Sequence, residues 1–131
     1  FYPLFKEINL LLLLEDDKHF YLPRVNGEKL EVCPYSIGDT LVTSDLKINE
    51  PVTDSVSSDI LDVVFLPALA VDKEYYRLGY GGGFYDRFLA GLPYNTKKIA
   101  VIPEELVFEA LPNEEYDIRC DGYITQKKAS F

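Results

Sequence analysis

The sequence contains no methionine and no tryptophan, and it has one histidine and two cysteines among its 131 residues. Cys33 and Cys120 lie far apart, without a CxxC pair or a Cys/His cluster, so the ligand spacing of a zinc site is missing. Two reduced thiols are typical of a cytosolic protein, and we expect a cytoplasmic location. We interpret His19, at the start of a predicted strand, as a solvated or half-buried residue and not as a catalytic base.

Positive charge is also scarce. The chain has 13 Lys and Arg against 22 Asp and Glu, a formal net charge of −9. Nucleic acids and anionic membranes reward a basic surface, so neither is expected as a partner. A small anionic ligand is not excluded, because backbone N–H groups with one or two arginines can form a local positive site.

Long hydrophobic runs are missing too. Leu10–Leu14 is an apolar run of five, far below the roughly 20 residues of a membrane span, and we interpret it as one buried turn of a helix. Phe1-Tyr2-Pro3 resembles the end of a strand entering a loop. Because the chain also has no methionine, we expect the natural protein to begin earlier.

Apolar residues make up 47% of the chain and aromatic residues 14%, enough for a buried core. A chain of this length without internal repeats is expected to form one domain, residues 1–131. A monomer is our expectation for the protein, although the sequence itself does not give the oligomeric state. In the first half, the pattern predicts a helix over residues 8–17, strands over 20–25 and 29–35 joined by a turn at Asn26-Gly27, and a polar connection over 36–58 with one short strand.

The second half alternates strands and helices. Residues 60–66 are apolar apart from Asp62, which is typical of a strand buried on both faces of a parallel sheet. Phe84, Phe88 and Leu92 have helical spacing, so a helix begins near Phe84 or Tyr85. The remaining predictions are a loop over 67–76, a strand over 98–102, a short helix over 103–111 and a last strand over 122–125. This order indicates an α/β fold with a mostly parallel sheet.

One stretch carries most of the chemistry: Arg77-Leu78-Gly79-Tyr80-Gly81-Gly82-Gly83-Phe84-Tyr85-Asp86-Arg87. Glycines let the backbone approach a ligand closely, and the start of a helix offers unpaired N–H groups, so a phosphate site is favoured. Arg77 and Arg87 flank the glycines and can neutralise phosphate oxygens, and Asp86 can hold Mg²⁺. The stretch matches neither the dinucleotide fingerprint nor the P-loop, so from the residues alone a structural turn or another ligand stays open.

The pattern R-L-G-x-G-x-G-[FY]-Y-D-R resembles the signature of the 5-formyltetrahydrofolate cyclo-ligases, and every fixed position is met. Four other runs fall in the order expected for that family, and the resemblance covers nearly the whole chain. These runs are Leu22-Pro23-Arg24, Glu50-Pro51, residues 62–72 (D-hydrophobic-P-x-x-x-x-D) and residues 111–121 (L-P-x-x-x-x-D-x-x-x-D).

The resemblance implies a fold and a reaction. The fold would be an open, Rossmann-like, mostly parallel sheet with helices on both faces. The reaction would convert 5-formyltetrahydrofolate and ATP to 5,10-methenyltetrahydrofolate, ADP and phosphate with Mg²⁺ as cofactor. The open alternatives are another phosphate-binding α/β enzyme and a non-catalytic nucleotide- or folate-binding relative.

The resemblance also implies roles for individual residues. Catalytic roles fall to Arg77, Tyr85 and Asp86, and magnesium ligation to Asp86 and Asp117. The residues implied in ATP binding are Arg77, Leu78, Gly79, Tyr80, Gly81, Gly82, Gly83, Phe84 and Tyr85. Those implied in binding the folate substrate are Asn9, Gly81, Gly82, Gly83, Phe84 and Tyr85. Asp121 is expected to cap or orient the final strand.

Several positions depart from the family pattern. Asn9, or Glu7 if the register slips, stands where the family places an acidic folate contact, and Phe84 stands where many members have Tyr. Tyr75 occupies a position that is usually Gly, and with Tyr76 it either lines the ligand mouth or packs under the loop. The family's N-terminal helix, with Lys and Arg that reach ATP, has no counterpart in the sequence. Glu104-Glu105 and Glu114-Glu115 are interpreted as solvated acidic faces.

Overall fold

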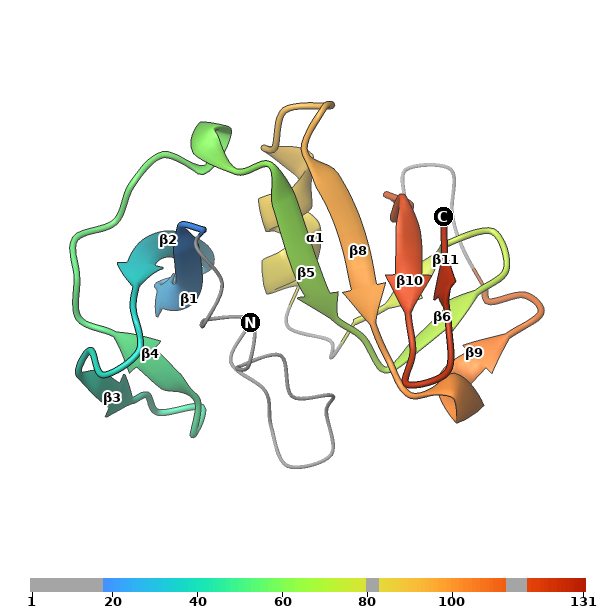
Figure 1. Ribbon diagram of the computed structural model, residues 1–131, viewed down its shortest axis with the longest axis horizontal. Coiled ribbons are helices and arrows are strands. Elements are labelled where there is room, and N and C mark those ends of the chain that lie inside the picture. The colour runs from blue at the N-terminus through green and yellow to red at the C-terminus, as the bar shows by residue number, and fades with distance from the viewer. Residues whose placement is uncertain (1–17, 80–82, 113–117) are drawn as a thin grey trace. The chain divides into compact units, whose positions relative to one another are not determined.

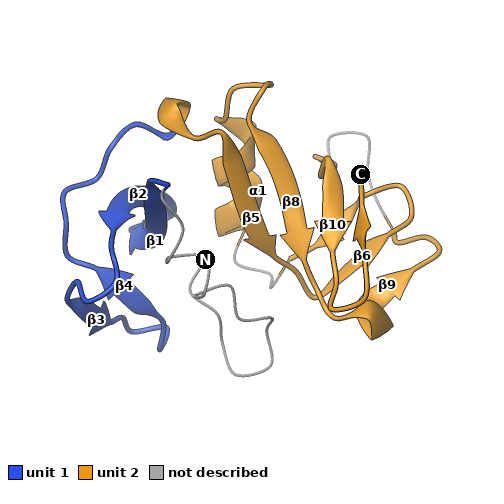
Figure 2. Ribbon diagram, viewed as in Figure 1, with its two compact units in different colours: residues 1–58 blue, residues 59–131 orange. Residues whose placement is uncertain are grey.

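The computed structural model describes residues 18–79, 83–112 and 118–131. The chain has a mixed α/β fold that is mostly strands (Figure 1). It divides into two compact units, residues 1–58 and 59–131 (Figure 2). The predicted helix over 8–17 lies outside the described residues, and the single domain over 1–131 stays a prediction. No helix within the described ranges is long and apolar enough to cross a membrane.

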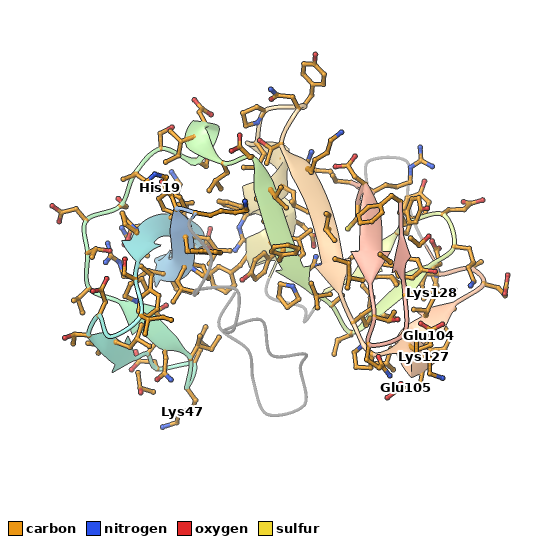
Figure 3. The ribbon with its side chains drawn as sticks, viewed as in Figure 1. His19, Lys47, Glu104, Glu105, Lys127 and Lys128 are labelled. Carbon is orange, nitrogen blue, oxygen red and sulfur yellow. The ribbon has the colours of Figure 1, made fainter. Side chains whose placement is uncertain are left out.

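The first unit contains the predicted hairpin. β1 (Phe20–Asn26) pairs antiparallel with β2 (Lys29–Tyr35), and Asn26 faces Lys29 across the ladder. The two-residue loop is therefore Gly27-Glu28, so the prediction of Asn26-Gly27 was wrong by one residue. Gly27 has φ +64°, and glycine at the first loop position suits the positive φ that a tight hairpin turn requires. His19, just before β1, is exposed, in agreement with its interpretation (Figure 3).

The connection after β2 contains two short strands and not the single one predicted. β3 (Leu41–Thr43) and β4 (Asn49–Pro51) form a second antiparallel hairpin. Two motif segments of the sequence meet here. The Arg24 guanidinium on β1 donates to the carbonyl oxygens of Pro51 at 3.2 Å and Thr53 at 2.7 Å. In return, the Glu50 carboxylate accepts a hydrogen bond from the Val25 backbone N–H at 2.8 Å. These runs therefore hold the first unit together.

The second unit is built on a four-stranded sheet in the order β11-β10-β8-β5 (Figure 1). β5 (Val63–Pro67), β8 (Lys97–Val101) and β10 (Gly122–Ile124) run parallel, which confirms the three predicted parallel strands with shifted ends. Residues 58–60 form a 3₁₀ turn, so β5 starts later than predicted. The antiparallel edge strand β11 (Ala129–Ser130) was not predicted.

A smaller sheet, in the order β7-β6-β9, lies in the same unit. β6 (Ala70–Asp72) pairs antiparallel with β7 (Arg77–Leu78) and parallel with β9 (Val107–Phe108). The loop predicted over 67–76 was wrong, because it contains β6. The short helix predicted over 103–111 was also wrong: only a 3₁₀ turn forms at Glu104–Leu106, and the chain then enters β9.

The core of this unit lies between the four-stranded sheet and α1 (Phe84–Ala90), which begins where the sequence predicted. Leu89 of α1 is buried with Leu66 and Ala100 of the sheet, and Figure 1 shows α1 beside β5 and β8. Apolar burial of this kind is the main stabilising term of the fold. Cys33 in the first unit and Cys120 in the second are both buried free thiols, as expected.

Candidate functional site

The glycine-rich stretch, residues 77–85, begins with β7 and ends in the first turn of α1. Gly83, the residue before α1, has φ +72°, in the left-handed region that favours glycine. Its carbonyl oxygen accepts a hydrogen bond from the Arg87 backbone N–H at 3.0 Å and so begins the helix. A Cβ at Gly83 would stand 2.6 Å from Nη1 of Arg87. The backbone conformation therefore favours glycine at the start of α1, and the Arg87 guanidinium occupies the space that a side chain would take.

The side chain of Arg77 is almost completely buried, with 3% exposed. Its Nε donates to the carbonyl oxygen of Pro67 at 2.6 Å, and its Nη1 lies 3.2 Å from Oδ1 of Asp86. The guanidinium also lies over the Tyr85 ring, 5.5 Å from the ring centroid. Arg77 thus joins the end of β5 to the first turn of α1. The sequence predicted a phosphate contact here, and it gave no sign of this buried position.

Asp86 is the exposed partner in this ion pair. Its side chain is 64% exposed and stands in the first turn of α1, where a carboxylate also complements the helix dipole. The buried guanidinium therefore fixes one carboxylate oxygen while the group still faces solvent. Among the described residues no cluster of three or more His, Cys, Asp or Glu could hold a metal ion. Asp86 is the described member of the predicted magnesium pair, and Asp117 lies outside the described residues.

Phe84 and Tyr85, the two aromatic residues of the motif that the structure describes, each pack against an arginine. Arg87 lies over the Phe84 ring at 5.2 Å from the centroid, as Arg77 does over Tyr85. Tyr85 is partly buried against the core. Cation–π contacts of this kind fix the planes of both rings at the start of α1. Asn9, Tyr80, Gly81 and Gly82, also predicted as site residues, lie outside the described residues, as does Glu7.

Asp72 is a residue whose role was missed. It is 1% exposed, and its carboxylate accepts three backbone hydrogen bonds, from Glu74 at 2.9 Å, Tyr76 at 3.0 Å and Leu111 at 2.9 Å. A buried carboxylate needs such donors, because burial of an unpaired charge is costly. Asp72 therefore shapes the turn between β6 and β7 and ties it to the segment that leads toward Asp117. The signal was present as the last residue of the P-x-x-x-x-D run.

Asp121 orients a strand, as predicted. Its carboxylate accepts a hydrogen bond from the Lys98 backbone N–H at 2.8 Å, and its own N–H donates to the Lys98 carbonyl at 2.7 Å. These two bonds align β8 and β10 at their amino ends.

Tyr76, in the turn before β7, lies under the Arg119 guanidinium, which is 5.6 Å from the ring centroid.

The sequence predicted that Glu104 belongs to a solvated acidic face, but the structure shows it partly buried and paired with a lysine. Its side chain is 26% exposed and lies 3.8 Å from the Lys128 ammonium, at the turn between β10 and β11. Figure 3 shows Glu104, Glu105, Lys127 and Lys128 gathered there. The backbone N–H of Glu104 also donates to the Gln126 side chain at 3.0 Å. Glu104 therefore joins the 3₁₀ turn at residues 104–106 to the turn between β10 and β11.

The comparisons with known proteins agree on one family. The family model for the 5-formyltetrahydrofolate cyclo-ligase family matches residues 6–126. A 5-formyltetrahydrofolate cyclo-ligase of Escherichia coli K12 is 36% identical over 118 residues, which cover 85% of this chain and 65% of the relative. One of Mycolicibacterium smegmatis is 34% identical over 92 residues, 68% of this chain and 47% of the relative.

A solved structure gives the same result. The NMR structure of Aquifex aeolicus 5,10-methenyltetrahydrofolate synthetase superposes with a TM-score of 0.83 and 32% identity, covering 97% of this chain and 66% of that one. The chain thus spans a little under two thirds of the Escherichia coli protein and of the Aquifex aeolicus structure, and about half of the Mycolicibacterium smegmatis protein. Because the family model matches most of the residues, the chain belongs to the 5-formyltetrahydrofolate cyclo-ligase family.

Proposed function

We propose that the protein carrying this chain converts 5-formyltetrahydrofolate and ATP to 5,10-methenyltetrahydrofolate, ADP and phosphate. Membership of the family supports this reaction, and since the chain spans only part of its relatives, the complete activity is a proposal for the whole protein. The observation that carries it is the arrangement at the glycine-rich stretch. Gly83 leads into α1 in a left-handed conformation, and the exposed Asp86 carboxylate is fixed beside it by a buried arginine.

The chemistry needs a phosphoryl transfer followed by ring closure. The formyl oxygen attacks the γ-phosphorus of ATP, an O–P bond forms, and the bond to the bridging oxygen breaks to release ADP. The neighbouring folate nitrogen then attacks the formyl carbon, its proton is released, and the C–O bond breaks so that phosphate leaves. Positioning and charge neutralisation are what the protein contributes to such a transfer.

We assign the ATP phosphates to the glycine-rich stretch, residues 77–85, and the folate to Asn9 and residues 81–85. Gly83 supports this assignment because its missing side chain lets the Arg87 guanidinium lie against the backbone at the start of α1. Arg77, Tyr85 and Asp86 are assigned to the reacting end of the site. The buried guanidinium of Arg77 supports this assignment because it contacts both Asp86 and Tyr85.

We assign Mg²⁺ as the cofactor, with Asp86 and Asp117 as its carboxylate ligands. Magnesium in phosphate-transfer sites is bound by one or two carboxylates together with substrate phosphates, so a larger protein cluster is not required. The exposed oxygen ligands of Asp86 are of the right chemical kind, and we assign Asp117 as the second carboxylate. When bound, the ion would neutralise charge on the phosphate oxygens. The buried guanidinium of Arg77 holds the Asp86 carboxylate in place for such a role, because it donates a hydrogen bond to Oδ1 of Asp86.

The finer expectations about fold and setting belong to the same proposal. We propose an open, Rossmann-like sheet with helices on both faces, and the three parallel strands β5, β8 and β10 support it. We also propose a cytoplasmic monomer whose ligands are ATP and 5-formyltetrahydrofolate, with no nucleic acid or membrane partner. The net charge of −9 supports the last point.

The test is turnover by the protein with its complete natural sequence. Methenyl product is followed by its absorbance after addition of 5-formyltetrahydrofolate, ATP and Mg²⁺, with omission of each as the control. We expect product that depends on all three. Binding of Mg·ATP and folate without product would instead identify a non-catalytic relative. Binding of neither ligand would refute the proposal and favour another phosphate-binding α/β enzyme.

A further inference from the structure

Tyr75 has a backbone conformation that its residue type rarely adopts. It stands in the turn between β6 and β7 with φ +72°, where an aromatic side chain is disfavoured and glycine is not. Its N–H donates to the Asp72 carbonyl at 3.0 Å, which closes the turn. An unfavourable φ persists only when the surrounding contacts over-determine it. The contacts of Tyr75 therefore show what the turn gains from this residue.

Three contacts join Tyr75 to the larger sheet of the second unit. Its carbonyl oxygen accepts a hydrogen bond from the Cys120 N–H at 2.8 Å, just before β10. Its hydroxyl lies 3.1 Å from the Ser130 hydroxyl on β11. Its ring packs against Tyr123 of β10, with centroids 5.9 Å apart and planes tilted by 59°, and Tyr123 is only 2% exposed. Tyr75 thus contacts both strands at one edge of the four-stranded sheet, β10 through its ring and β11 through its hydroxyl.

The hairpin held in this way carries the start of the glycine-rich stretch. β7 begins at Arg77, two residues after Tyr75, and the Leu78 carbonyl accepts a hydrogen bond from Leu69 at 2.8 Å. Arg77 then reaches Asp86 on α1. We propose that Tyr75 is a positioning residue that fastens the β6–β7 hairpin to β10 and β11 and so keeps the glycine-rich stretch ready for its ligand. The identity of that ligand, Mg·ATP, rests on the proposed function.

Tyr75→Gly is the informative variant, because glycine accepts the positive φ and the change removes the ring and the hydroxyl without added backbone strain. Tyr75→Phe and Ser130→Ala each remove the same hydroxyl contact from opposite sides. The matched control is Tyr94→Gly, since Tyr94 is 96% exposed in the same unit. All variants are made in the protein with its complete natural sequence and compared at a temperature where each is fully folded.

Two measurements test the proposal. In ligand-free protein, we expect amide hydrogen exchange at residues 76–79 to accelerate about tenfold in Tyr75→Gly, with β5 and β8 unchanged. By calorimetric titration, we expect Mg·ATP affinity to weaken about fivefold, because ordering the loop now accompanies binding. Tyr75→Phe and Ser130→Ala should have smaller, equal effects that do not add, and Tyr94→Gly should have none.

Unchanged exchange at residues 76–79 in Tyr75→Gly would overturn the anchoring role. A lower melting temperature with unchanged Mg·ATP affinity would overturn the positioning role, because a purely structural residue behaves in that way. If the parent protein itself binds no Mg·ATP, the proposed function fails, and the exchange result alone then supports or refutes the anchoring by Tyr75.

Discussion

Two arginines, one in each unit, both donate to the carbonyl oxygen of a proline, yet their other partners differ. Arg24 bonds to the carbonyls of Pro51 and Thr53, and its ion pair with Glu31 is sheltered about equally on both sides, with 26% and 25% of the side chains exposed. Arg77 bonds to Pro67 and is 3% exposed, whereas its partner Asp86 is 64% exposed.

This difference separates a structural contact from a site. The charge of Arg24 is neutralised by its cross-strand neighbour in the hairpin, with which it pairs in register. The charge of Arg77 is buried and holds a carboxylate that still faces solvent. A fixed carboxylate that is mostly exposed next to a glycine-rich stretch can take a further ligand more readily than the half-buried Glu31 carboxylate of the hairpin. Similar motif arginines therefore have different expected consequences when they are changed.

The largest expected effect comes from Asp86→Asn, which keeps the size of the side chain but removes the charge that Mg²⁺ needs. We expect turnover to methenyl product to fall about 100-fold or more, because phosphoryl transfer depends on the metal. Stability should fall by about 0.3–1 kcal/mol through the helix dipole, and loss of the charge that pairs with the buried Arg77 guanidinium should add to this cost. Asp62→Asn, an exposed acid in the same unit, is the control and should change neither. Turnover of Asp86→Asn within a few-fold of the parent would make Asp86 a helix-start residue only.

Replacing each arginine by alanine breaks the comparison directly. Arg77→Ala leaves the buried Pro67 carbonyl unpaired and should cost about 2–4 kcal/mol of unfolding free energy, together with most of the turnover. Arg24→Ala should cost about 1–3 kcal/mol and leave turnover per folded molecule unchanged. Urea denaturation gives the stabilities, and the absorbance of the product gives the rates. Equal loss of specific activity in both variants would remove the distinction between the units.

The two buried thiols give a comparison by pH. Burial raises the pKa of Cys120 from its ordinary 9.0 to about 11, and burial also raises the pKa of Cys33. Both thiols are protonated in either state below pH about 9. Above pH about 9, Cys120 loses its proton in the unfolded chain but keeps it in the folded protein, and this difference favours the unfolded chain. Stability should therefore fall by up to about 2–3 kcal/mol as pH rises from about 9 to about 11.

Cys120→Ala isolates this contribution, since other groups titrate in the same range. Urea midpoints of the parent and of Cys120→Ala should converge as pH rises to about 11, and Cys33→Ala should show the same trend more weakly. A constant difference between the parent and Cys120→Ala across this range would contradict the buried, protonated thiol.

The smallest expected effect is the loss of stability when a glycine with positive φ is replaced by alanine. Two such glycines allow the cost of backbone conformation to be compared with the cost of side-chain packing. Gly27 in the first unit and Gly83 in the second have φ of +64° and +72°, but a Cβ at Gly27 meets nothing within 4 Å while one at Gly83 meets Arg87. Gly27→Ala should cost about 1 kcal/mol, the backbone cost alone, and Gly83→Ala about 1–2 kcal/mol. Thermal unfolding measures both. Equal costs would mean that the Arg87 side chain moves aside freely.

The sequence predicted the elements that have strong local patterns. The apolar runs of β5 and β8, the hairpin of β1 and β2, and the start of α1 were predicted because their periodicity and turn residues act locally. β6, β7, β9 and β11 have two or three residues each and were missed, since so short a pattern carries no periodicity. Their pairing depends on contacts that are distant in the sequence.

The sequence motif pointed to residues for a candidate site but did not predict their arrangement. The motif pointed to Arg77 and Asp86, whereas the burial of one and the exposure of the other follow from packing against Pro67 and Tyr85. The positive φ of Tyr75 was invisible, because tyrosine does not signal that conformation as glycine does. Two further roles became visible only in the structure: the Asp72 carboxylate accepts three backbone hydrogen bonds, and Arg24 donates to the carbonyls of Pro51 and Thr53.

The measurement that tests the central claim most directly is the thermal shift produced by ATP with and without Mg²⁺, in the parent and in Asp86→Asn. At about 100 times its dissociation constant, Mg·ATP should stabilise the parent by about 2.7 kcal/mol, and free ATP should stabilise it less. In Asp86→Asn, the additional shift due to Mg²⁺ should disappear. Equal shifts with and without Mg²⁺ in the parent, or an undiminished magnesium effect in Asp86→Asn, would contradict the assignment of this carboxylate to the site.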